Sequence, residues 1–179
     1  MNPFEVRTAT LEDVEALAAL AKASVEELGR AFYTDEQTGS AKECITTPDL
    51  DLIEDGTLFV ATVGDEIVGC GAWSKRNKLY TGSELGSEAC LYLDPDRDPA
   101  RIRAFFVAPS MARKGIATAI LARCIEAARL SGFKRLELMA TLPGVPFYER
   151  HGFAKLEPAD LPLTDGTQLP AIRMGLDLV

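Results

Sequence analysis

The chain has 179 residues, 47% of them hydrophobic and 26% charged, and its formal net charge is -8 at pH 7. This composition excludes a fibrous or disordered chain and predicts a single domain over residues 1–179 with a sizeable core. The acidic balance argues against a nucleic-acid partner and mildly favours cationic acceptors such as amines. No uncharged run approaches the ~20 residues that span a bilayer, so we expect no membrane partner.

The cysteine and histidine content predicts no metal site. The cysteines are scattered without a Cys-x-x-Cys pair, and His151 is the single histidine. The N-terminus lacks the basic start and apolar stretch of a secretory signal. Reduced thiols in a cytoplasmic protein are therefore the simpler interpretation. The four cysteines are Cys44, Cys70, Cys90 and Cys124.

The first half of the chain predicts a strand, several helices and a hairpin. Thr10 is suited to cap a helix whose apolar residues share one face and which Gly29 closes. Two apolar strand patterns flank Gly64 and Asp65, a pair suited to a tight hairpin turn. The predicted elements are a strand at 4–8, a helix over 10–29, weaker helices near 35–44 and 49–55, and strands at 57–63 and 66–73.

A long polar connection follows, over about residues 74–101. Loops of this length inside compact domains are usually functional or partly disordered. We interpret it as an insertion on the acceptor side of the site, with a short strand at 89–93. A flexible loop without a functional role is an equally good alternative.

Residues 102–140 predict a strand, a helix and a second strand. Residues 102–107 are rich in β-branched and aromatic side chains and end before Pro109, which cannot donate to a sheet ladder. Apolar residues from Ala117 to Ala128 recur at helical spacing, and residues 134–140 resume a strand pattern. The unit is a right-handed β-α-β crossover with parallel strands.

The turn before this helix predicts an anion site. The first N–H groups of a helix have no partner inside it, and the helix dipole adds positive charge there. The chain places Arg113 and Lys114 at this point, and Gly115 and Ala117 leave the backbone open to a phosphate. The competing interpretation is a solvated basic corner. A Walker loop and a dinucleotide fingerprint both require residues that are missing.

The end of the chain predicts a short helix and two strands. Residues 143–151 form the helix, with Gly152 in the left-handed position past its end. Residues 153–157 form one strand, and the alternation over residues 172–178 indicates a half-buried antiparallel strand.

Residues 107–117 resemble the acyl-CoA pyrophosphate loop of the GNAT superfamily of N-acetyltransferases. The pattern of that family is Gln or Arg, two residues, Gly, one residue, then Gly or Ala. Gly115 and Ala117 match the last two positions, whereas Ala112 stands at the first and the cation has moved to Arg113. Residues 147–153 are similar to the Tyr-x-x-x-Gly-Phe segment of the same superfamily. The resemblance is close over about 102–153, the expected acyl-CoA-binding core.

The resemblance implies an α/β (α+β) fold: a mixed, mostly antiparallel sheet of six or seven strands, with splayed central strands and helices on both faces. It also implies an acyltransferase, specifically an N-acetyltransferase that moves an acetyl group from the cosubstrate acetyl-CoA to a primary amine by direct attack on the thioester. Tyr148 is the candidate general acid. The backbone N–H of Phe106 or Val107 is the candidate donor that polarises the thioester carbonyl. The candidate cofactor-binding residues are Phe105, Phe106, Val107, Ala112, Arg113, Lys114, Gly115, Ile116, Ala117, Thr118 and Phe147.

Several roles stay open at this point. Without the resemblance, Tyr148 is better explained as an ordinary packing aromatic, and Trp73 is best explained as core or cleft wall. For His151 we favour a cation that complements a helix end. The base is either a water chain or one of five carboxylates, each more commonly a solvated surface group: Glu26, Glu27, Asp35, Glu36 and Glu137.

The partners are also open. The acceptor is a small-molecule amine or a protein amine, and the sequence is compatible with a homodimer. The alternative function is a non-catalytic acyl-CoA-binding sensor or interaction module. A nucleotide-binding regulatory domain is disfavoured because the Walker lysine-serine pair is missing.

Overall fold

The computed structural model describes residues 3–80 and 91–178. Seven strands form one sheet in the order β1-β2-β3-β4-β5-β7-β6. All neighbours are antiparallel except β4 and β5, which are parallel, so the predicted mixed, mostly antiparallel fold is confirmed. The strands are β1 (Glu5–Thr8), β2 (Leu58–Val63), β3 (Glu66–Ser74), β4 (Ala100–Val107), β5 (Arg135–Thr141), β6 (Ala154–Pro162) and β7 (Gln168–Asp177).

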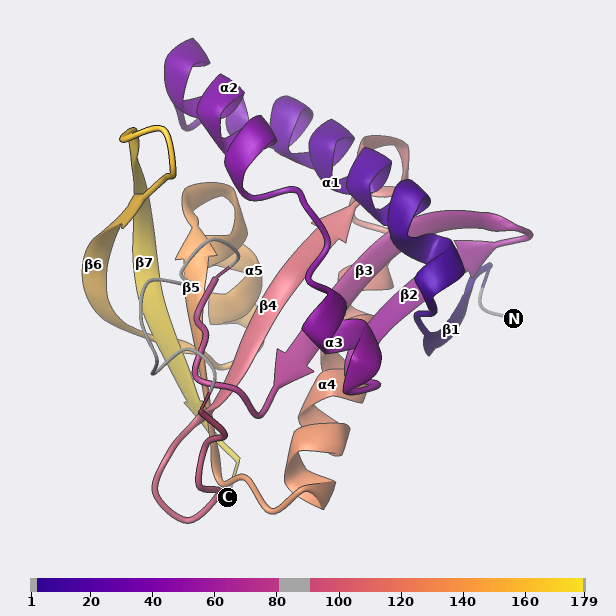
Figure 1. The fold of residues 1–179 in the computed structure, drawn as a ribbon, viewed down its shortest axis with the longest axis vertical. Helices are drawn as coiled ribbons and strands as arrows, with labels where there is room; N and C mark the ends of the chain where they lie inside the picture. The colour runs from indigo at the N-terminus through magenta and orange to yellow at the C-terminus, as the bar shows by residue number, and fades with distance from the viewer. Residues whose placement is uncertain (1–2, 81–90, 179) are drawn as a thin grey trace.

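The helices cover both faces of the sheet, as predicted (Figure 1). Leu17 of α1 packs in one core cluster with Val60 of β2, whereas Ile120 of α4 packs in the other with Phe59. Because successive strand residues point to opposite faces, α1 and α4 lie on opposite sides of β2. The helices are α1 (Val14–Gly29), α2 (Asp35–Cys44), α3 (Leu50–Glu54), α4 (Ile116–Leu130) and α5 (Val145–Arg150).

The sheet splits between its two parallel strands. β4 and β5 pair only from Ala100 with Leu136 to Ile102 with Leu138. Beyond this point β4 continues beside β3 as far as Val107, and β5 continues beside β7. The two strands therefore diverge toward their C-terminal ends (Figure 1). The predicted splay is confirmed.

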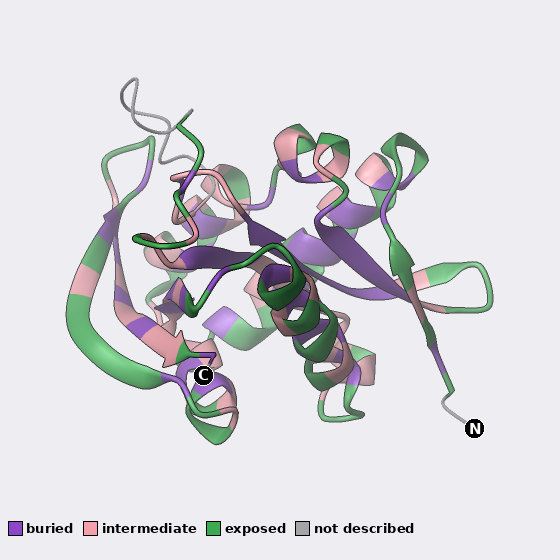
Figure 2. Cartoon of the chain, turned by 90° about the horizontal axis from the view of Figure 1, so that it is seen from below, coloured by how far each residue is buried: buried purple, intermediate pink, exposed green. Residues whose placement is uncertain are grey.

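Three parts of the chain differ from the sequence prediction. β7 begins at Gln168, before the predicted start at residue 172. β6 runs to Pro162, well beyond the predicted 153–157. It is the outer strand of the sheet and mostly exposed (Figure 2), so its sequence shows little of the apolar alternation from which a strand is predicted. Prolines are tolerated on such an edge. The predicted strand at 89–93 lies partly outside the described residues. Its last part pairs with the residues that follow β3, since the N–H of Leu93 donates to the carbonyl of Lys75 at 2.7 Å.

Candidate active site

The first turn of α4 presents backbone N–H groups that no side chain caps. Gly115 precedes the helix with a φ of 83°, and Arg113 has a φ of 64°. A Cβ atom built on Gly115 would meet nothing within 4 Å, so the backbone here is open to a ligand. The N–H groups of Ile116, Ala117 and Thr118 have no partner within the helix, because an α-helix bonds each N–H to the fourth residue before it. The geometry suits an anion.

Two glycines of β3 determine how closely α4 approaches the sheet. A Cβ atom on Gly69 would lie 2.4 Å from Cγ2 of Ile116, the first residue of α4. A Cβ atom on Gly71 would lie 2.6 Å from the ring of Phe105. Such distances are much shorter than a carbon–carbon contact of 3.5–4.0 Å. Both positions therefore require glycine, a role that the sequence analysis did not assign because the contacts link distant segments.

The end of β4 directs a backbone N–H into the gap beside β5. The N–H of Ala108 donates to the carbonyl of Val68 at 2.9 Å, and Phe106 pairs with Cys70 two residues along. Bonded and non-bonded pairs alternate in an antiparallel ladder, so Val107, between these two pairs, turns its N–H away from β3. Two backbone N–H groups were candidates to polarise the thioester carbonyl. The register directs the N–H of Phe106 toward β3, so it favours the N–H of Val107.

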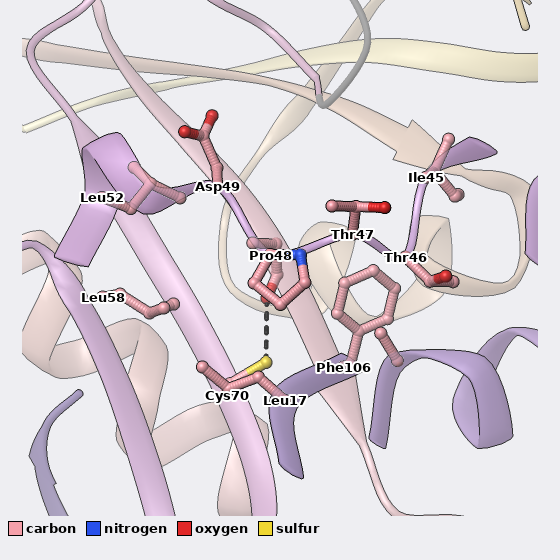
Figure 3. A pocket seen from close by; sticks show the side chains of 12 residues that line it. Leu17, Ile45, Thr46, Thr47, Pro48, Asp49, Leu52, Leu58, Cys70 and Phe106 are labelled. Atoms are coloured by element: carbon pink, nitrogen blue, oxygen red, sulfur yellow. Dashed lines mark hydrogen bonds between the residues drawn. The ribbon is translucent and has the colours of Figure 1, made fainter. Parts of the chain in front are cut away.

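A buried cysteine supports an irregularity in the same strand. The pairing of β3 with β4 shifts register near Ala104, which has a φ of 58°. The thiol of Cys70 donates to the carbonyl of Ala104 at 3.2 Å, beside a cavity of about 20 Å³ (Figure 3). Burial raises the pKa of Cys70 to about 12, so the thiol remains a donor at neutral pH. The bulge re-aims the end of β4.

Tyr148 lies in an aromatic cluster with its hydroxyl available. Its ring packs edge-to-face against Phe105 at 6.1 Å, Phe147 at 5.1 Å and Phe153 at 5.5 Å, and the residue is 7% exposed. The hydroxyl has no hydrogen-bond partner within the part of the chain that the structure describes. Burial first, and then the neighbouring Cys124, raise the pKa of Tyr148 above its ordinary value, so the phenol stays protonated at neutral pH.

A single cavity of about 660 Å³ joins these features. It extends from the start of α4, along the splayed part of β4, to the C-terminal part of α1 and the β6–β7 hairpin. Of the predicted site residues only Lys114 is outside its lining; the Lys114 amine lies 3.4 Å from the sulfur of Met111. The predicted residues that line the cavity are Phe105, Phe106, Val107, Ala112, Arg113, Gly115, Ile116, Ala117, Thr118, Phe147 and Tyr148.

His151 links the end of α5 to the first turn of α4, a contact that the sequence analysis did not foresee. Its Nδ1 lies 2.8 Å from the carbonyl oxygen of Phe147, and its Nε2 lies 3.2 Å from the hydroxyl of Thr118. A carbonyl only accepts, so Nδ1 donates to Phe147, and Nε2 and the Thr118 hydroxyl share the second hydrogen bond. The sequence signal that could have predicted this contact was the position of the single histidine, four residues after Phe147.

The candidate bases lie elsewhere. Glu137 is held by two arginines, Arg101 at 2.7 Å and Arg173 at 2.9 Å, which gives it a structural role. Glu26 pairs with Lys42 at 2.9 Å. Among the described residues no aspartate or glutamate lines the cavity. The cavity lining thus omits Glu137 and Glu26, and also Glu27, Asp35 and Glu36.

Other expectations concern metals, thiols and the core. Within residues 3–80 and 91–178, no group of three or more His, Cys, Asp or Glu side chains is placed to hold a metal ion. Nor does any helix in those ranges have the length and apolarity to cross a membrane. Cys44, Cys70 and Cys124 are free thiols, and Cys90 lies outside the described residues. Trp73 is buried against Phe133, which confirms it as a core residue.

An uncapped helix start lies beside a split pair of parallel strands, an arrangement that suits an extended, phosphate-bearing ligand. The chain belongs to the acetyltransferase (GNAT) family, because the model of that family matches residues 22–153. No curated protein matched the chain.

Solved structures share the fold at low sequence identity. A GCN5-related N-acetyltransferase from Rhodopseudomonas palustris has a TM-score of 0.73 and 18% identity, covering 97% of this chain and 94% of that chain. The PaiA N-acetyltransferase from Thermoplasma acidophilum, in complex with coenzyme A, has a TM-score of 0.67 and 16% identity, covering 97% and 98%. The yncA protein from Salmonella typhimurium, with its cofactor acetyl-CoA, has a TM-score of 0.65 and 17% identity, covering 98% and 94%. These likenesses confirm the predicted GNAT-like fold.

Proposed function

We propose that the protein is an N-acetyltransferase that moves an acetyl group from acetyl-CoA to a primary amine by direct attack on the thioester. The observation that supports this most is the continuous cavity, which joins the open amides of α4, the splayed end of β4 and Tyr148. The structures of fold neighbours with coenzyme A and acetyl-CoA add support for the cosubstrate.

The residues at the start of α4 fit a pyrophosphate. The N–H groups of the first turn and the helix dipole supply partial positive charge, and Arg113 adds a full one. Ala112 supplies no cation, so the backbone provides most of the contacts. An extended pantetheine arm fits beside β4, because the free edge there offers the backbone groups that a neighbouring strand would use.

Each chemical task has a candidate group. The N–H of Val107 polarises the thioester carbonyl where negative charge develops. The amine nitrogen bonds to the carbonyl carbon as the carbon–sulfur bond breaks, and Tyr148 donates its proton to the departing thiolate. Tyr148 can supply this proton because its phenol is protonated at neutral pH. The proton of the amine leaves through water, since no described carboxylate lines the cavity.

An acyl-CoA-binding sensor is the competing function. Both functions need the α4 turn and the gap in the sheet. The cavity, however, continues beyond Tyr148 to α1 and the β6–β7 hairpin, which provides space for an acceptor. A sensor needs no such space and should bind acetyl-CoA without consuming it.

Thermal unfolding with and without acetyl-CoA tests the binding step. Acetyl-CoA at 100 times its dissociation constant should add about 2.7 kcal/mol of stability. Gly115→Glu should abolish this increase by placing an anion where phosphates bind. Gly39→Glu is the matched control, because a Cβ atom on Gly39 meets nothing within 4 Å and this residue lies outside the cavity lining. An undiminished increase in Gly115→Glu would refute the assigned phosphate site.

Steady-state turnover tests the acid. Tyr148→Phe should lower turnover at least tenfold, about 1.4 kcal/mol of barrier, while the stabilisation by acetyl-CoA stays nearly unchanged. Tyr92→Phe is the control, since Tyr92 is 63% exposed and outside the cavity lining. Unaltered turnover in Tyr148→Phe would remove Tyr148 from the mechanism.

A further inference from the structure

The part of the cavity beyond Tyr148 has an apolar wall, which we call the acceptor chamber. The C-terminal half of α1, the end of α2 and the β6–β7 hairpin form it, and these elements pack together in one cluster of apolar side chains. α2 packs beside α1 and also contacts β7 (Figure 1). The chamber residues are Val25, Leu28, Phe32, Ile45, Leu161 and Leu169.

Two large apolar side chains remain exposed at the rim of the chamber. Leu28 is 42% exposed and Phe32 is 49% exposed, and both line the cavity. Leu28 lies in the last turn of α1, and Phe32 lies in the turn that follows this helix. Large apolar side chains that are exposed to solvent at the mouth of a cavity are typical of a site where a bound ligand covers them.

Two polar side chains of the cavity wall make hydrogen bonds or ion pairs within the protein. The hydroxyl of Tyr33 donates to the carbonyl of Pro170 at 2.7 Å and accepts from the N–H of Leu142 at 2.8 Å. The guanidinium of Arg103 forms an ion pair with Asp49. These groups hold the chamber walls in place and leave the chamber surface mainly apolar.

The charge of the lining decides which amines fit. Across the described residues the cavity wall includes Arg113, Arg150 and Arg103 but no carboxylate. An amine with further ammonium groups would bring charges out of water without counterions, which is costly. An amine on an aromatic or branched aliphatic body would instead cover the exposed rim and gain from burial.

We propose that the acceptor is a primary amine on an apolar body, and that polyamines and lysine-rich segments are poor acceptors. This inference rests on the proposed N-acetyltransferase activity and specifies its substrate class. The reaction forms the carbon–nitrogen bond and breaks the carbon–sulfur bond. The amine gives one proton to water, the thiolate takes one from Tyr148, and Tyr148 regains its proton from water, so the products are an uncharged amide and the free thiol.

Thiol release from acetyl-CoA with two amines tests the substrate class. The kcat/KM for 2-phenylethylamine should exceed that for spermidine at least tenfold. Equal values, or a preference for spermidine, would overturn the inference. Binding is measured separately, as the rise in Tm when 2-phenylethylamine is added to the protein saturated with coenzyme A. A rise without turnover would support the chamber and refute the enzyme, whereas no rise would overturn the chamber.

A substitution at the rim of the chamber tests whether the chamber determines the preference between the two amines. Leu28→Glu should lower kcat/KM for 2-phenylethylamine at least tenfold and raise it for spermidine, because it adds a carboxylate to an apolar rim. Leu130→Glu is the control, since Leu130 is 83% exposed on α4 and outside the cavity lining, and it should change neither value. Unchanged values for both amines in Leu28→Glu, with normal acetyl-CoA binding, would refute the assignment.

Discussion

Replacing Gly69 with alanine tests whether β3 sets the position of α4. The added Cβ would lie 2.4 Å from Cγ2 of Ile116 and 3.5 Å from Cδ1 of Ile120. Carbon atoms pack at about 3.5–4.0 Å, so the start of α4 must move away by about 1 Å. The Cγ2 atom cannot swing aside, because a β-branched residue in a helix is confined to one main rotamer.

Overpacking of this kind costs about 1–3 kcal/mol. For a chain of this length each kcal/mol corresponds to about 2–4 °C, so about 2 kcal/mol should lower Tm by about 4–8 °C. Urea unfolding and thermal melts measure the change in stability. The stabilisation by acetyl-CoA should also fall in Gly69→Ala, because the amides of α4 move with the helix.

Two further variants make the result specific. Gly39→Ala adds the same methyl group in α2 where nothing lies within 4 Å, and should raise stability by about 0.4–1 kcal/mol. Ile116→Leu removes the branch that collides, so Gly69→Ala combined with Ile116→Leu should lose less stability than the two single changes together. If Gly69→Ala were as stable as Gly39→Ala, or if the two sites showed no coupling, α4 would not be held by this contact.

Two other regions give predictions. Asp49→Asn should cost about 3 kcal/mol in urea unfolding, because it leaves the buried Arg103 without its carboxylate. Burial raises the pKa of Asp49, but the charges of Arg103 and Lys78 outweigh this effect and lower it, so this stability is present above pH ~4 and is lost as the pH falls through the lowered pKa. The gap between wild type and Asp49→Asn should therefore shrink in acid, and a constant gap would contradict the assignment. His151→Ala should weaken acetyl-CoA binding, measured by calorimetry, because Thr118 loses its partner; unchanged affinity would make the bridge irrelevant to binding.

Local patterns predicted most of the fold. The helix over Ile116–Leu130 and the strands β2 and β3 were predicted to within a few residues, because apolar spacing and turn residues are local signals. The outer strand β6 was predicted too short, since an exposed edge leaves little apolar alternation. The split between β4 and β5 was predicted only through the family resemblance.

The site was predictable in part. The anion turn could be predicted from Gly115 and its neighbours, since a helix start is a local feature. Residues that act across the fold gave no such signal. The thiol of Cys70 bonds to a carbonyl 34 positions away, and Glu137 meets arginines 36 positions away on either side. The apolar character of the acceptor chamber likewise depends on packing between segments far apart in the chain.

Only three residue pairs join β4 to β5, so the sheet is two half-sheets hinged at one corner. Glu137 and its two arginines clamp that corner by linking β4, β5 and β7 with charges. Beyond this ion-pair cluster, the facing edges of β4 and β5 form no backbone hydrogen bonds with each other. A bound pantetheine arm would form hydrogen bonds with these edges, so the donor would occupy the position of an additional strand while it is bound. Amide hydrogen exchange at Val107 and its neighbours should then slow only while the donor is bound.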